Sequence, residues 1–150
     1  MAGFISLADA KAQMRVDSAD EDALIQRLIH AAGLAVERRS GFVAGEREHA
    51  FQFDRFDRAL ELRLRPVEAS TIGITYLDSS GDSQSVTEFR VIERHGTTRI
   101  LPAIGSAWPT AICEPGAVTV TATVGFASSD EDGAANAPAN VLHAVRVCVA

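Results

Sequence analysis

The chemically reactive residues of this chain lack the spacing that a catalytic or nucleotide-binding site requires. The single lysine, Lys11, falls within a predicted helix, so no glycine-rich loop ending in Gly-Lys-Ser or Gly-Lys-Thr is present to hold phosphates. The same fact leaves no other lysine to form a Schiff base. No Gly-x-Gly-x-x-Gly pattern and no Gly-x-Ser-x-Gly elbow occur, so nothing supports a dinucleotide site or a serine hydrolase.

Residues that bind metals are scattered in the same way. No two histidines stand at i and i+4 on one helix face, and all four are isolated: His30, His49, His95 and His143. The acidic segments 78–82 and 130–133 lack the ligand spacing of a calcium loop. Cys113 and Cys148 match no ligand spacing and are expected to be buried free thiols. We therefore predict no metal, no cofactor and no enzymatic activity.

The charge balance argues against a dedicated nucleic-acid-binding protein. The formal net charge is −6, whereas contacts to phosphates need clustered positive charge. The arginine groups Arg38-Arg39, Arg55/Arg58 and Arg63/Arg65 each lie near acidic residues in the sequence. Their local charge nearly cancels, which favours a mixed, solvated surface.

Helical periodicity marks the beginning of the chain. Ser6 begins a capping box, so residues 6–15 are predicted to form a short helix. A second capping signal at Ser18 predicts a long helix from about Asp20 to Ser40, stopped by Gly41. Two adjacent apolar rows in this helix are expected to face the core together. They are Leu24, Leu28, Ala31 and Ala35, and Ile25, Ile29, Ala32 and Val36.

From about residue 45 the apolar period becomes two, which predicts strands. The predicted strands lie at about 60–64, 72–76, 88–93 and 118–124, separated by turns. After a polar loop at 127–136, Pro138 fits the first turn of a final helix, with an apolar face that includes Val141 and Val145.

The predicted fold class is therefore α+β, with a helical core and an inserted antiparallel β-sheet or small barrel-like unit. We expect a single domain with a helical part (1–43), a β-rich part (44–126) and a carboxy-terminal loop and helix (127–150). No apolar run approaches the roughly 20 residues that span a bilayer, and the first residues do not form a signal peptide. Synthesis in the cytoplasm, without membrane contact, is the expectation.

Several segments resemble the head-to-tail connector (adaptor) proteins of long-tailed phages and gene transfer agents. At the amino terminus these are Ile5–Lys11, Met14–Asp17 and Asp20–Ile25. Further matches, in the same order along nearly the whole chain, are Pro66-Val67, Ile74–Asp78 with Gly81, Pro102-Ala103, Trp108-Pro109, Gly116–Thr121, Gly125-Phe126 and the helix at Pro138.

The resemblance implies a structural adaptor without catalytic residues. Such a protein forms a homo-oligomeric ring, typically of twelve copies, beneath the portal protein of the capsid. A tail-side stopper or tail terminator protein binds below the ring, and DNA passes through its channel without specific binding. Members usually continue past the final helix into a segment that helps anchor the ring. This sequence stops at Val147–Ala150, so we expect either that the chain continues past Ala150 or that this member lacks that anchor.

Contacts between subunits or partners are expected to explain the exposed features of the chain, because large aromatic residues and arginine are enriched at interface centres. The candidates are Leu34, Arg38, Arg39, Arg63, Arg65, Trp108 and Phe126. For Trp108 the alternative is that it closes the core of the sheet. The competing interpretation of the whole chain is a small soluble β-containing binding module.

Overall fold

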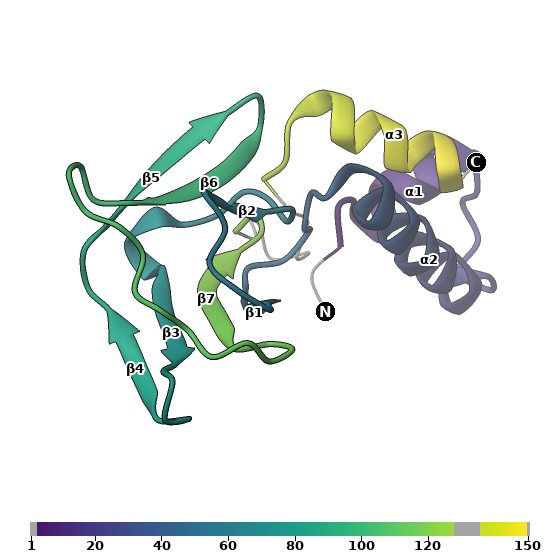
Figure 1. Ribbon diagram of the computed structural model, residues 1–150. Helices are drawn as coiled ribbons and strands as arrows, with labels where there is room; N and C mark the ends of the chain where they lie inside the picture. The colour runs from purple at the N-terminus through teal and green to yellow at the C-terminus, as the bar shows by residue number, and fades with distance from the viewer. Residues whose placement is uncertain (1–2, 128–135, 150) are drawn as a thin grey trace. The chain divides into compact units, whose positions relative to one another are not determined.

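A computed structural model describes residues 3–127 and 136–149 of the chain. The chain divides into two compact units, a helical unit of Met1–Glu46 with Gly125–Ala150 and a β unit of Arg47–Val124. The helices lie in the first unit and the strands in the second (Figure 1). The predicted α+β class is confirmed. The acidic residues 130–132 of the predicted polar loop lie outside the described residues.

The helices begin and end at residues whose local chemistry explains the boundaries. Helix α1 spans Leu7–Met14, and the Ser6 hydroxyl accepts a hydrogen bond from the Asp9 amide at 3.1 Å, as the capping box predicts. Helix α2 spans Asp22–Ser40 and ends at Gly41, which adopts a left-handed conformation with φ 75°. The predicted cap at Ser18 is wrong. Its hydroxyl bonds to the amide and carboxylate of Asp20 and forms a turn before the helix.

The core of the helical unit lies among its three helices. Helix α3 spans Ala139–Val149 and follows Pro138, as predicted. It packs against α2 and, less extensively, against α1 (Figure 1). The buried residues of this core are Phe4, Ile5, Ala10, Ile25, Ile29, Ala32, Ala44, Val141, Val145 and Val149.

Only one of the two apolar rows of α2 faces this core. Ile25, Ile29 and Ala32 are buried, whereas Leu24 is 47% exposed and Leu28 is 40% exposed. The expectation that both rows are buried is therefore wrong. Successive residues turn by about 100° around a helix, so the two rows point in different directions. Helices α1 and α3 cover one row, and the other row reaches the surface.

The β unit contains seven strands and one short 3₁₀ helix at Ala69–Thr71. The strands are β1 (Arg47–Phe53), β2 (Leu60–Leu62), β3 (Gly73–Leu77), β4 (Ser83–Val86), β5 (Phe89–Arg94), β6 (Thr97–Pro102) and β7 (Val118–Val124). They form two antiparallel sheets, with the orders β1-β7-β3-β4 and β2-β6-β5. Residues 47–124 therefore contain open sheets rather than a closed barrel.

Strand β7 lies between β1 and β3 and buries every second residue from Val118 to Val124. This strand was predicted with the correct bounds, and β3 and β5 lie within one residue of their predicted bounds. The alternation predicted to continue to residue 64 ends at Leu62 as a strand. Strands β1, β4 and β6 were not predicted, because β1 buries only Phe51, β4 is mostly polar and exposed, and β6 buries a threonine, Thr98.

Two further findings concern single groups. Cys113 and Cys148 are exposed free thiols, so the expectation of buried cysteines is wrong. Cys148 is exposed in the last turn of α3, and Cys113 lies in the loop before β7. Among the described residues, no helix combines the length and apolar character needed to cross a bilayer.

Candidate assembly interface

The titratable side chains of the described residues do not form a recognisable active site or metal site. Within residues 3–127 and 136–149, no group of three His, Cys, Asp or Glu side chains is placed to hold a metal ion. The pKa of Asp78 is lowered, first by the hydrogen bond from the Gln84 side chain and then by bonds from the amides of Asp82 and Ser80. These bonds close the turn between β3 and β4, which is a structural role.

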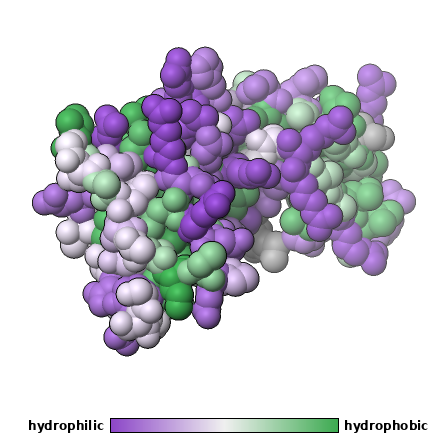
Figure 2. Space-filling view, in the orientation of Figure 1, coloured by the Kyte–Doolittle hydropathy of each residue, from purple (hydrophilic) through white to green (hydrophobic). Residues whose placement is uncertain are grey.

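One candidate interface is the uncovered face of α2, formed by Leu24, Leu28, Ala31 and Ala35. These residues follow one another at intervals of four, three and four, so they form a nearly straight row along the helix. Two of them are large apolar side chains at the surface. Figure 2 shows hydrophobic surface lying among hydrophilic side chains over the helical unit. The two alanines would allow another backbone to approach closely.

The predicted residues Leu34, Arg38 and Arg39 lie along the same side of α2. Leu34 is 40% exposed, and it stands one turn before Arg38, so the two side chains are neighbours on the helix. Arg39 stands one turn after Ala35. Both arginines are exposed in the last turn, where a positive charge is favourable at the negative end of the helix. This end of the α2 row therefore carries positive charge.

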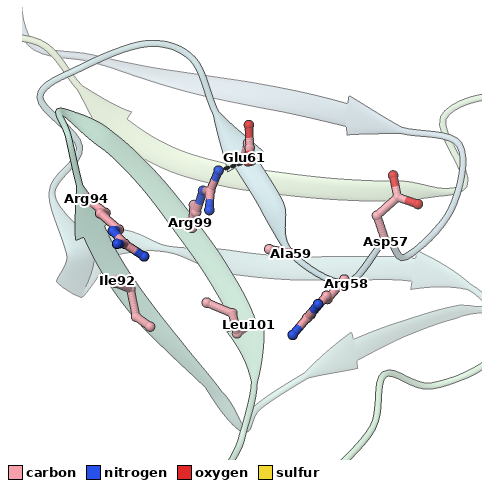
Figure 3. Close-up of a pocket in the computed structure, with 8 residues that line it drawn as sticks. All are labelled: Asp57, Arg58, Ala59, Glu61, Ile92, Arg94, Arg99 and Leu101. Carbon is pink, nitrogen blue, oxygen red and sulfur yellow. Dashed lines mark ion pairs between the residues drawn. The ribbon is translucent and has the colours of Figure 1, made fainter.

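A second candidate interface is one face of the sheet β2-β6-β5. Glu61 pairs in register with Arg99, and Arg99 pairs with Ile92 on the other side. Side chains two residues apart in a strand share a face, so Arg90 and Arg94 lie on the same face as Ile92. A pocket of about 470 Å³ opens on this face and is lined by Asp57, Arg58, Ala59, Glu61, Ile92, Arg94, Arg99 and Leu101 (Figure 3). Arg63 is exposed immediately after β2.

The remaining predicted residues make packing contacts within their own units. The Arg65 Nη1 group donates a hydrogen bond to the Gly96 carbonyl at 3.1 Å and so holds the turn between β5 and β6. Trp108 stacks on Phe56 with ring centroids 4.9 Å apart, which agrees with the alternative that it closes the sheet's core. Phe126 stacks on Phe42 at 5.7 Å, next to the core of the helical unit. These three side chains are therefore used in packing within their own units.

Arg90, Ile92, Arg94 and Arg99 were not among the predicted interface residues. A signal for three of them was present, because Arg90, Ile92 and Arg94 alternate with other residues at the period of a strand. The position of Arg99 depends on pairing between β5 and β6, which the sequence pattern did not reveal.

Comparisons with known proteins identify the amino-terminal part of the chain. Residues 4–62 match the family described as "Phage gp6-like head-tail connector protein". This segment includes α1, α2 and the first two strands. A search of curated proteins gave no match.

Solved structures share the fold over almost the entire chain. A chain from the "Neck of empty GTA particle computed with C6 symmetry" matches with a TM-score of 0.70 and 22% identity, over 97% of this chain and 75% of that one. A chain from the "Virion of native gene transfer agent (GTA) particle" matches at 0.69 and 21%, over 97% and 76%. A chain from the "Neck of native GTA particle computed with C12 symmetry" matches at 0.62 and 22%, over 99% and 80%.

At such identities these likenesses establish the fold, and the family match covers the segment 4–62. The family description is that of structural proteins joining the head and the tail of a particle. The resemblance seen in the sequence is confirmed: residues 4–62 are similar to phage head-tail connector proteins, and the chain shares its fold with proteins of gene transfer agent particles.

Proposed function

We propose that this chain is a ring-forming adaptor of a tailed phage or gene transfer agent, and that it has no enzymatic activity. In this role about twelve copies would form a ring beneath the portal protein. Tail-side stopper or terminator proteins would bind the opposite side, and DNA would pass through the central channel.

The observation that carries the proposal is the family match at residues 4–62, supported by the shared fold. The matched chains come from necks solved with six-fold and twelve-fold symmetry, and twelve copies are compatible with both. The uncovered row of α2 supports the same proposal. A stable monomer gains nothing from placing Leu24 and Leu28 in water, whereas a subunit interface would bury them.

Measuring the mass of the purified chain tests ring formation directly. Sedimentation velocity over a wide range of protein concentrations should reveal a large species in reversible equilibrium with the monomer. Negative-stain images of that species should show closed rings of uniform size. A chain that remains monomeric throughout, also with purified portal protein present, would contradict the adaptor role and favour the small binding module.

A second experiment tests the position in the particle. Antibody or gold labelling of a tagged chain should mark the junction between head and tail in intact particles. Labelling on the capsid surface or along the tail tube would contradict the proposed position.

A further inference from the structure

The outer face of the sheet β2-β6-β5 concentrates positive charge in an acidic protein. Four arginines surround the apolar side chains of Ile92 and Leu101, namely Arg58, Arg90, Arg94 and Arg99 (Figure 3 labels all but Arg90). Ile92 is 39% exposed. We call this set the arginine face. It combines an apolar centre with a charged rim, which is the composition of a protein-binding surface.

Most of this charge is available to a partner. The Arg99 guanidinium pairs with Glu61 across the strands, and the Arg90 Nε group donates to the Pro102 carbonyl at 3.2 Å. Within the described residues, Arg58 and Arg94 form no ion pair. Figure 3 shows their side chains extending from separate segments on either side of Ile92 and Leu101.

The chain itself carries a surface of the opposite charge. The segment 17–22 contains four carboxylates, Asp17, Asp20, Glu21 and Asp22. Asp22 is bound to the Lys11 ammonium at 2.7 Å, while the other three are exposed. Leu24 and Leu28 follow directly in the uncovered row of α2. We call this second surface, residues 17–28, the acidic end of α2, and it too combines charge with exposed apolar side chains.

We infer that the arginine face of one copy binds the acidic end of α2 of the next copy. This inference rests on the proposed ring and names the surfaces that form it. Arg58 and Arg94 would face carboxylates of the neighbouring copy, while Ile92 and Leu101 would cover Leu24 and Leu28. Because the two surfaces differ, the contact is head to tail, and repetition of such a contact generates a ring when the rotation closes.

Duplex DNA is the other polyanion that an arginine face could meet, but the surface favours protein. Ile92 and Leu101 lie at its centre, where a phosphate backbone would leave them without apolar contact. A neighbouring α2 supplies both the apolar side chains and the negative charge.

Two charge-reversal variants of the full chain test this contact. Arg58→Glu with Arg94→Glu makes the arginine face acidic, and Asp17→Arg with Glu21→Arg makes the acidic end basic. Each variant alone would then present like charges across every contact. We expect the protein concentration at half-assembly to rise roughly tenfold or more for each. An equimolar mixture should assemble again, because the two variants can alternate around a ring with opposite charges at each contact.

Assembly of the mixture would show that the variants fail alone because this contact is lost, and not because of their net charge or misfolding. The first variant raises the net negative charge and the second lowers it, yet both should lose assembly. Arg58→Lys with Arg94→Lys keeps the charge and should assemble far better than the glutamate variant. Circular dichroism and thermal melting confirm that every variant is folded before its mass is measured by sedimentation.

The remaining outcomes overturn the inference. Folded variants that assemble alone like the wild type, or a mixture that stays monomeric, exclude this contact while leaving the ring itself intact. A wild-type chain that never assembles removes the ring and its interface together. If the wild type binds labelled duplex DNA and the glutamate variant loses that binding while still assembling, the arginine face binds phosphate instead.

Discussion

Exchanging Ile29 and Leu28 for alanine, one at a time, tests which side of α2 stabilises the helical unit. Ile29 is 8% exposed and Leu28 is 40% exposed, although the residues are adjacent and both changes remove three carbon atoms. Burial contributes about 0.8 kcal/mol per carbon, and the cavity adds to the loss. Ile29→Ala should therefore lower the free energy of unfolding by about 3–4 kcal/mol. Leu28→Ala should lower it by about 1.5 kcal/mol or less, since part of that side chain is already in water.

The assay needs to follow the helical unit of the monomer. Far-ultraviolet circular dichroism during urea unfolding does so, because the helices dominate that signal. Fluorescence of Trp108 reports the β unit in the same samples and serves as an internal control. Dilute protein avoids a contribution from subunit contacts, which we expect Leu28 to make. Equal losses for the two variants, or a larger loss for Leu28→Ala, would refute the assignment of the buried row.

Three further predictions concern other elements. On α3, Val145→Ala should lower the free energy of unfolding by about 2 kcal/mol because Val145 is fully buried. Val147→Ala should leave the melting temperature nearly unchanged because Val147 is 59% exposed. Similar losses of stability in the two variants would contradict the orientation of α3. The pKa of Asp78 is lowered below 3.8 in the fold, so Asp78→Ala should reduce stability at neutral pH. The difference in stability between this variant and the wild type should shrink as the pH falls through 3.8 and then through the folded pKa. A difference that stays constant down to low pH would contradict a stabilising role of the Asp78 carboxylate. The isolated chain should bind labelled duplex DNA weakly at both ~50 and ~200 mM salt, whereas tight binding that weakens about a thousandfold across this range would refute a passive channel.

The helices were predictable because their signals are local. A capping serine at Ser6, a left-handed Gly41 and a proline before α3 mark boundaries that depend on a few neighbouring residues. For α2, the sequence predicted the apolar stripe but not which of its two rows is buried. Its apolar stripe is broad, and the positions of α1 and α3 decide which part is covered. Those positions depend on contacts between elements that are distant in the sequence, such as α2 and α3, and periodicity alone does not specify such contacts.

The strands show the same limit in another form. Strand β7 was predicted well because its buried valines and Ala122 alternate strictly with half-buried threonines. Strand β6 is equally central in its own sheet, yet its inward residues include Thr98 as well as Ile100. A buried threonine breaks the apolar alternation by which a strand is recognised. The position of β6 in the middle of its sheet depends on its pairing with β2 and β5, which lie far from one another in the sequence.

The arginine face was missed because charge was counted along the sequence. Glu93 precedes Arg94, and in a linear count the two charges cancel. In a strand, however, adjacent side chains point to opposite faces, so Glu93 lies on the other side of the sheet from Arg94. The antiparallel pairing of β5 with β6 then places Arg99 opposite Ile92, between the positions of Arg90 and Arg94. Strand geometry thus separates charges that the sequence places together, and strand pairing gathers charges that the sequence keeps apart. A surface of this kind can be predicted only after the pairing of the strands is known.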